Sequence, residues 1–226
     1  MISVIEAIEG RRSVRAFLPD KPVSRAKIER TLAIAGRAPS GSNIQPWKVH
    51  VVQGQPLQQL KAALHARHEA GDPGKREYNY YPVTWREPYL GRRRENGWGL
   101  YGILDIKRGD TAAMSKQHGR NFLFFDAPAA LIFTLDKDME IGSWLDTGMF
   151  IQSVMLAARG EGLETCPQAA HCNYADTVRA QLSISEDQSV VCGMALGYPD
   201  PNARANSFQA TRIPVAEFVT FHDDNA

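Results

Sequence analysis

Three arginines and a serine stand within five residues near the start of the chain, in the segment Arg11-Arg12-Ser13-Val14-Arg15. Side chains alternate along an extended chain, so an extended segment places Arg11, Ser13 and Arg15 on one side. A guanidinium offers a fork of N–H donors that fits a phosphate or another planar anion. The segment therefore predicts an anion-binding site, and the alternative is a basic turn that is simply solvated.

A second candidate site is the polar loop Pro39-Ser40-Gly41-Ser42-Asn43-Ile44-Gln45-Pro46. Prolines at both ends stiffen such a loop, and its hydroxyl and amide groups offer varied donors and acceptors. These groups can recognise the polar edge of a heterocycle. The alternative is a plain connection between a helix and a strand.

Other kinds of chemistry find little support in the sequence. It has neither a GxSxG nucleophile elbow nor a phosphate-binding GxGxxG turn after a predicted strand. Its three cysteines lack the spacing of a zinc site, and we expect reduced, mostly buried thiols. The six histidines are scattered, and His65 and His68 lack a third ligand, so we expect no metal.

The bulk composition is that of an ordinary globular protein. Hydrophobic residues make up 43% of the chain and charged residues 23%, with a net charge of +1. A near-neutral chain argues against a nucleic-acid partner. Apolar runs are too short for a membrane span, and the first residues lack the basic-then-apolar layout of a signal peptide. We expect a cytoplasmic protein of one domain, residues 1–226, with no membrane partner.

The first seventy residues show local signals for three helices and a strand. Ser3 and Glu6 form a capping box for a short helix that Gly10 ends. Ser24 can cap a second helix, ended by Gly36, and Pro56 starts a third. Residues 47–52 alternate like a half-buried strand. These elements flank both candidate segments and would position them.

The second half predicts further helices and two buried strands. Strands are expected at 129–135 and 189–196, an irregular stretch at 163–171, and an added strand at 218–221. Helices are expected after the caps Asp110 (to about Phe125), Ser143 with Asp146 (to Arg159) and Asn173 (to about Leu182). The helix ending at Arg159 is apolar almost all round, which is typical of a central buried helix. The pattern predicts an α+β fold, with helices covering a small mixed or antiparallel sheet.

Residues 71–108 interrupt this pattern with glycine, proline, arginine and many aromatic residues. A structureless loop of this length is unusual in a compact domain. We therefore expect an excursion with short helices that forms a lid, a substrate wall or a contact with a partner subunit. Residues from about 198 to 226 read as a turn-rich C-terminal extension.

The two candidate segments, in this order, resemble the nitroreductase family of FMN enzymes. The resemblance continues through residues 121–128, 144–152, 162–167, 196–199 and 212–214, and covers most of the chain outside residues 71–108. It implies a three-layer α+β fold. It also implies a homodimer with FMN at the subunit interface.

The resemblance implies roles for individual residues by matched position. Arg11 and Ser13 match residues that hold the FMN phosphate, Arg12 lies beside them, and Arg212 matches a second phosphate contact. Arg15 matches a cation at the pyrimidine edge of the flavin. Two further sets complete the implied site: the backbone N–H groups of Gln168, Ala169 and Ala170 near flavin N5 and O4, and a loop from the neighbouring subunit with Pro39, Ser40, Ser42 and Asn43.

The chain departs from well-known relatives in two places. Ala169-Ala170 stands where they carry Glu-Gly, and Ala210 stands where a lysine is common. Backbone N–H donors survive the first change. The second removes a cation, which leaves Arg15 as the positive charge at the flavin edge.

The implied activity is hydride transfer from NADH or NADPH to a nitroaromatic or quinone acceptor by a ping-pong mechanism. The aromatic and arginine content of residues 71–108 favours a flat acceptor, such as a nitrobenzoate. The cofactor carries the chemistry, so no catalytic side chain is required. Other flavin chemistry of the superfamily, reductive dehalogenation or flavin breakdown, stays open, as does a non-enzymatic binder of a phosphorylated ligand or nucleic acid.

Overall fold

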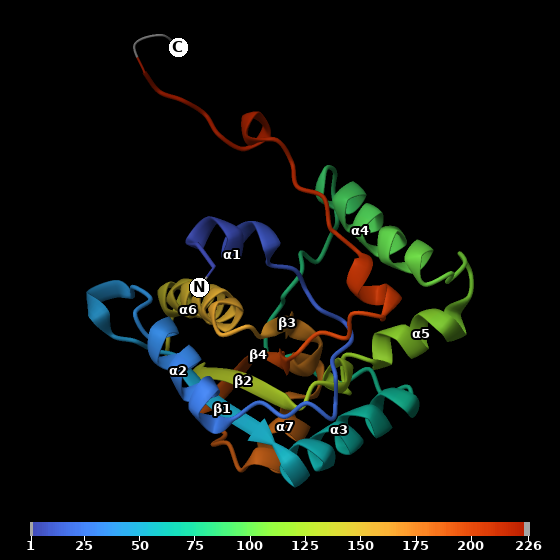
Figure 1. The fold of residues 1–226 in the computed structure, drawn as a ribbon, viewed down its shortest axis with the longest axis horizontal. Coiled ribbons are helices and arrows are strands. Elements are labelled where there is room, and N and C mark those ends of the chain that lie inside the picture. Colours follow the sequence, from blue (N-terminus) through green and yellow to red (C-terminus); the bar gives the residue numbers. More distant parts are fainter. Residues whose placement is uncertain (1, 224–226) are drawn as a thin grey trace.

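A four-stranded antiparallel sheet lies at the centre of the computed structural model, which describes residues 2–223 (Figure 1). The strand order is β1-β2-β4-β3. Val51 of β1 pairs with Leu131 of β2, which pairs with Met194 of β4. The strands are β1 (Lys48–Gln53), β2 (Ala129–Asp136), β3 (Glu164–Gln168) and β4 (Gln188–Gly197).

Helices cover both faces of the sheet, which gives three layers (Figure 1). Alternate residues of β2 belong to different cores: Ala130 and Ile132 to one, Leu131 and Phe133 to the other. A strand buried on both faces reads as a continuous apolar run, as β2 does. The helices are α1 (Val4–Gly10), α2 (Arg25–Ala35), α3 (Gly54–Glu69), α4 (Tyr89–Ile103), α5 (Thr111–Gly119), α6 (Ile141–Gly160) and α7 (Ala175–Leu182).

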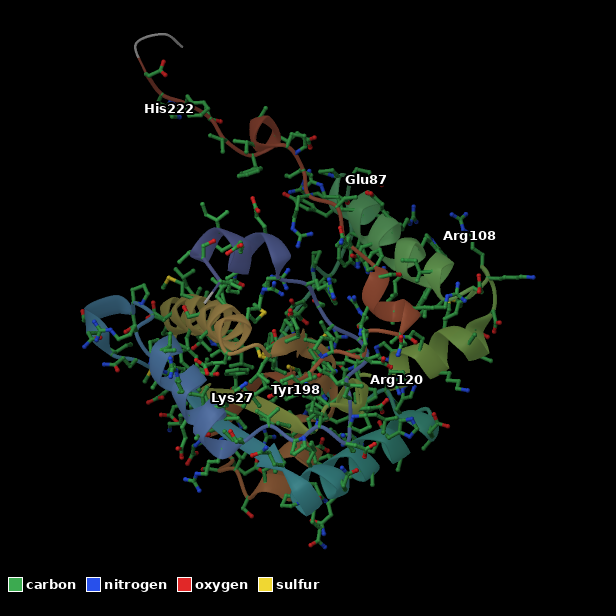
Figure 2. The ribbon with its side chains drawn as sticks, in the orientation of Figure 1. Lys27, Glu87, Arg108, Arg120, Tyr198 and His222 are labelled. Atoms are coloured by element: carbon green, nitrogen blue, oxygen red, sulfur yellow. The ribbon has the colours of Figure 1, made fainter. Side chains whose placement is uncertain are left out.

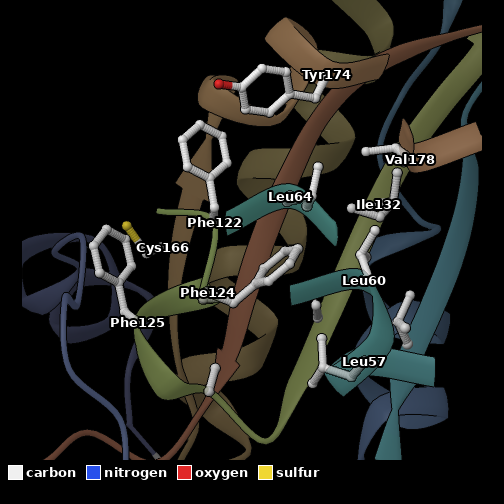
Figure 3. Close-up of a cluster of buried hydrophobic side chains, with 14 of the residues drawn as sticks. Leu57, Leu60, Leu64, Phe122, Phe124, Phe125, Ile132, Cys166, Tyr174 and Val178 are labelled. Carbon is white, nitrogen blue, oxygen red and sulfur yellow. The ribbon is translucent and has the colours of Figure 1, made fainter. Parts of the chain in front are cut away.

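The core on the α3 and α7 side is built on a leucine stripe (Figure 3). Leu57, Leu60 and Leu64 follow the three-then-four spacing of one helix face and are fully buried. They meet Ile132 of the sheet and the aromatic residues of segment 122–125. Burying each such side chain contributes roughly 1.5–3 kcal/mol.

Helix α6 forms the core of the opposite layer together with α2. Phe150 stacks on Trp47 with ring centroids 4.7 Å apart and meets Phe133 edge-on at 6.1 Å. The other side of α6 is open in the single chain, where Ile141 is 83% and Leu145 68% exposed. The expected central helix is therefore buried on one side only within one chain.

Three predicted helix caps are confirmed. Ser3 and Glu6 make the reciprocal capping box of α1. The side chains of Ser24 and Asp110 accept hydrogen bonds from Lys27 N at 3.3 Å and Ala113 N at 2.9 Å. Each cap satisfies a backbone N–H that has no partner inside its helix.

Two other predicted caps are wrong. Helix α6 begins at Ile141, so Ser143 lies inside it, where its hydroxyl donates to Met139 Sδ. Helix α7 starts after Tyr174, and the Asn173 side chain instead accepts from Arg76 Nε at 2.6 Å. Asn173 thus has a partner 97 residues away, whereas Ser143 bonds to a residue just before the helix.

The expected irregular stretch at 163–171 is partly wrong, because residues 164–168 form strand β3. Pro167 disguises the strand in the sequence, since proline cannot donate to a sheet ladder. It is tolerated because β3 is an edge strand. The strand expected at 218–221 is absent: this segment leads away from the sheet, and Phe218 and Phe221 are exposed (Figure 1).

The helix expected to reach Phe125 ends at Gly119. A turn follows in which Phe124, Phe125 and Asp126 all have positive φ. This left-handed turn lets Phe122 and Phe124 enter the core, and Phe125 O accepts from Phe17 N at 3.0 Å. The turn thereby holds the chain just beyond the basic segment.

The excursion at 71–108 contains an irregular stretch and then α4, whose 15 residues exceed the short helices expected. Tyr78 anchors the irregular stretch, meeting the Trp144 ring at 4.6 Å and donating to Val191 O. Residues 97–102 have the GxGxxG spacing but lie inside α4 rather than after a strand. Gly99 is needed there because an added Cβ would lie 2.7 Å from the Phe208 ring.

The C-terminal segment runs along α4 and then away from the rest of the chain, as the position of His222 shows (Figure 2). Thr211 donates to Glu95 at 3.1 Å, and Glu217 accepts from Arg92 at 3.4 Å. Among residues 2–223, none of the helices combines the length and apolar content of a membrane span.

Candidate functional site

A cavity of about 930 Å³ lies between the basic segment, three helices and the C-terminal segment. Its size falls within the range of cofactor and ligand pockets. The lining residues are Ile8, Glu9, Gly10, Arg11, Arg12, Ser13, Arg15, Asn96, Gln152, Met155, Pro167, Phe208, Gln209, Ala210 and Arg212. All the predicted phosphate-site residues and Arg15 are thus brought to one cavity.

The basic segment is held against strand β3. Ser13 forms a parallel bridge with Thr165, and Val14 N donates to Thr165 O at 3.1 Å. Val14 is fully buried, while its neighbours Ser13 and Arg15 line the cavity. The alternation expected of an extended segment therefore holds for residues 13–15, whereas Arg12 lines the same cavity as Arg11 and Ser13.

Asn206 fixes the backbone at the far end of this segment. Its side chain accepts from Arg15 N at 2.8 Å and donates to Ala16 O at 2.8 Å. Asn206 is 8% exposed. The sequence carried no signal for this residue, because it lies 191 positions from Arg15.

One end of the cavity is electropositive. Burial and the nearby charge of Arg212 lower the pKa of the Arg11 guanidinium. Arg12 Nε is buried without a hydrogen-bond partner among residues 2–223. A bound anion would relieve the repulsion and satisfy this donor, so the residues present fit a phosphate group.

Arg15 lies where the large cavity meets a smaller one of about 220 Å³. The two share Ser13, Arg15 and Pro167. The smaller cavity is also lined by Leu100, Tyr101, Gln117, His118, Asn121, Phe125 and Cys166. Arg15 and the amide groups here offer hydrogen bonds to the polar edge of a planar ring.

The turn at residues 169–174 follows Gln168, the last residue of β3. Gln168 is 3% exposed, and its Nε2 donates to Asn121 O at 2.7 Å. The side chain therefore points into the protein, and neither Gln168, Ala169 nor Ala170 lines the cavity. The role predicted for their backbone N–H groups stays a prediction.

The buried side chain of His171 fixes this turn from within the core. It is fully buried, its Nδ1 lies 3.2 Å from Gln168 O, and its ring stacks on Phe124 at 4.2 Å. Burial lowers the pKa of His171 to about 4. The ring is therefore neutral at pH 7 and serves the packing of the turn.

The predicted polar loop does not reach the cavity of its own chain. Ser42 and Asn43 have φ of 48° and 58°, and Ser40 Oγ accepts from Gln45 N at 3.0 Å. Gly41 N donates to Asp146 on α6 at 3.1 Å. None of Pro39, Ser40, Ser42 and Asn43 lines either cavity. Their predicted role, a contact with the flavin of a neighbouring subunit, stays a prediction.

Several residues that line the cavity were not predicted from the sequence. Asn96, Gln152, Met155 and Phe208 come from α4, α6 and the C-terminal segment. They are single residues in unremarkable contexts, and only tertiary packing brings them together. No local pattern could have identified them.

The expectation of free, mostly buried cysteines is confirmed. Cys166, Cys172 and Cys192 are free and buried, and burial raises the pKa of the Cys166 thiol to about 11. No cluster of histidine, cysteine, aspartate and glutamate within residues 2–223 could hold a metal ion.

Sequence comparison identifies the family of the chain. The sequence model of the Nitroreductase family matches residues 8–198. The chain therefore belongs to the nitroreductase family. The predicted resemblance and the α+β fold are confirmed.

Two curated relatives align over nearly the whole chain. A 4-nitrobenzoate reductase of Pseudomonas putida is 42% identical over 95% of this chain and 93% of its own. A chloronitrobenzene nitroreductase of Comamonas testosteroni is 37% identical over 96% of this chain and 95% of its own.

Two solved structures share the fold closely. The FMN and NADPH-dependent nitroreductase NfnB from Sphigopyxis sp. strain HMH superposes with a TM-score of 0.95 at 39% identity, covering 98% of this chain and 100% of that one. The FMN-dependent NfnB from Mycobacterium smegmatis, in complex with NADPH, gives 0.92 at 33% identity, with 97% of each chain covered.

Proposed function

We propose that this chain is an FMN-dependent nitroreductase that uses NADPH or NADH to reduce a nitroaromatic acceptor. The observation that carries the proposal is the single cavity lined by Arg11, Arg12, Ser13, Arg15 and Arg212. The NfnB enzymes, which share this fold, are FMN-dependent and use or bind NADPH. FMN, when bound, would supply the hydride chemistry.

The residues of the chain would bind and orient the cofactor. Arg11, Ser13 and Arg212 would hold its phosphate, with Arg12 Nε as a further donor. Arg15 would face the pyrimidine edge, where a fixed guanidinium stabilises developing negative charge without reorganisation. The backbone N–H groups of Gln168, Ala169 and Ala170 would orient the ring from the turn after β3.

We also propose a homodimer in which the partner subunit completes the site. Exposed apolar residues on α1 and α6 need a surface to cover them: Val4 is 72%, Ile5 67% and Leu145 68% exposed. The loop with Pro39, Ser40, Ser42 and Asn43 is tied to α6 by Gly41. Dimerisation through α6 would carry this loop toward the cavity of the partner.

The proposed acceptor is a nitroaromatic with a carboxylate, such as 4-nitrobenzoate. Arginine is the principal charged residue of the cavity lining, and Glu9 is its one acidic residue. A relative 42% identical is a 4-nitrobenzoate reductase. We further propose a cytoplasmic location, with no nucleic-acid or membrane partner; the near-neutral charge of the chain supports the absence of a nucleic-acid partner.

Turnover under anaerobic conditions tests the proposal. NADPH should bleach the flavin absorbance of the holoenzyme, and 4-nitrobenzoate should restore it while a hydroxylamino product forms. Nitrobenzene and a quinone serve as uncharged acceptors for comparison. A flavin that NADPH and NADH both leave oxidised, or that no nitroaromatic reoxidises, would refute the proposal.

A further inference from the structure

One face of α4 forms a wall of the site. Asn96 lines the large cavity and Leu100 the smaller one. Arg93 stands three residues before Asn96 and seven before Leu100, so it shares their face of the helix. In Figure 2, α4 lies between the labels of Glu87, just before the helix, and Arg108, in the segment that leads to α5. Arg93 therefore lies one turn from the cavity lining, toward the start of the helix.

Arg93 is held in place but its charge is not neutralised. Its guanidinium carbon lies 5.0 Å from the centre of the Trp85 ring. The adjacent Arg92 pairs with Glu217, whereas Arg93 has no ion pair within residues 2–223 and is exposed. Stacking occupies the flat face of a guanidinium and leaves its N–H edge free for a planar or tetrahedral anion.

The electron donor has phosphate groups that the cavity cannot hold. A dinucleotide is too large to enter a cavity that already contains FMN, so its adenosine half must lie at the rim. The GxGxxG spacing at residues 97–102 lies inside α4 and offers no helix N-terminus for a pyrophosphate. Arg11 and Arg212 would be occupied by the FMN phosphate. The donor phosphates therefore need another cation near the entrance.

We propose that Arg93, positioned by Trp85, binds a phosphate group of the reduced nicotinamide dinucleotide while its nicotinamide end enters the cavity. The inference rests on the proposed function and extends it to the donor. A guanidinium–phosphate contact is charge-assisted and often bidentate. Arg93 contributes binding only, since it lies away from the reacting atoms.

Rapid anaerobic reduction of the holoenzyme tests the inference. Arg93→Ala should raise the apparent Kd for NADPH by roughly tenfold or more, the loss expected for one charge-assisted hydrogen bond. The limiting rate of flavin reduction should stay within about twofold, because only ground-state binding is lost. Arg93→Lys should recover part of the affinity, and Trp85→Leu should lose part of it.

Arg94→Ala is the matched control, since Arg94 is exposed, has no ion pair within residues 2–223, and points about 100° away around the helix. Its Kd for NADPH should equal that of the parent. Parallel titrations with NADH identify the phosphate: a loss for both donors assigns the pyrophosphate, and a loss for NADPH alone assigns the 2′-phosphate. Either result supports the inference.

Three results would overturn it. Equal donor affinities in Arg93→Ala and Arg94→Ala would remove Arg93 from the donor site. A raised KM for 4-nitrobenzoate with unchanged donor affinity would make Arg93 a contact of the acceptor carboxylate instead. Failure of both donors to reduce the parent enzyme would refute the proposed function itself, before any variant is compared.

Discussion

At the scale of single residues, the basic segment is informative because its chemistry is local. Arg11, Ser13 and Arg15 were predicted to share a side from their spacing alone, and the structure places them around one cavity. Their assignment to parts of FMN came from family resemblance and stays a proposal. Asn96 and Asn206 show the limit, since each acts through partners far away in the sequence.

Removing Arg11 tests the phosphate end of the site. Arg11→Ala should weaken FMN binding by roughly tenfold or more, because it removes a charge-assisted contact beside Arg212. Fluorescence titration of the flavin-free protein measures the Kd. Arg25→Ala is the control, since Arg25 pairs with Glu29 on the exposed side of α2. Equal FMN affinity in the two variants would contradict the assignment.

His171 should make stability fall in mild acid. Its folded pKa of about 4 lies below the unfolded value of 6.5, so below pH 6.5 the unfolded chain binds a proton that the folded chain does not. Stability is full above pH 6.5 and should decline by roughly 1.4 kcal/mol per pH unit as pH falls toward 4.

Urea unfolding between pH 7.5 and 4.5 measures this decline. His171→Phe keeps the stacking on Phe124 and should show a shallower dependence on pH. The control His222→Gln changes an exposed residue of the C-terminal segment and should keep the parent slope. Parallel curves for parent and His171→Phe would refute the role given to His171.

At the scale of elements, helix caps and apolar periodicity were predicted well where the signal is local. Ser3, Ser24 and Asp110 cap the helices that they were expected to cap. Strand β3 was missed because Pro167 breaks the strand pattern, and its partner β4 lies in a distant segment. Sheet pairing depends on contacts across the chain, which local propensity does not contain.

The packing of β4 against the turn at 169–174 depends on Gly193. An added Cβ there would lie 2.3 Å from His171 Nδ1, so Gly193→Ala must displace the histidine. We expect a loss of about 1–3 kcal/mol in unfolding free energy, with weaker FMN binding because the turn moves. Chemical denaturation and FMN titration measure both effects.

Gly142→Ala is the comparison, because nothing lies within 4 Å of an added Cβ at Gly142. Alanine is the better helix former, so this variant should be as stable as the parent or slightly more so. A Gly193→Ala protein with parent-like stability and FMN affinity would show that the contact with His171 is easily relaxed.

At the scale of the whole molecule, the α+β architecture was predictable, whereas the internal structure of the excursion at residues 71–108 was not. Residues 71–108 gain their structure from tertiary anchors, such as Tyr78 on Val191 and Trp144. The C-terminal segment likewise follows α4 through Thr211 and Glu217. Neither interaction has a signature in the local sequence.

The exposed apolar faces of α1 and α6 should be covered by a second copy of the chain. Light scattering should therefore give twice the chain mass of 25.1 kDa. Leu145→Asp places a charge on the open side of α6 and should shift the protein toward monomer. Because the proposed site is shared between subunits, the same variant should also retain less FMN. A monomeric parent that retains FMN would contradict the proposed shared site.

The absorption spectrum of the purified protein, after equilibration with excess FMN and desalting, tests the central claim most directly. The account predicts a yellow protein that releases about one FMN per chain on denaturation, since the proposed FMN site is the basic cavity that each chain carries. A colourless protein, or one that retains flavin equally well when Arg11 and Arg15 are both replaced by alanine, would contradict it.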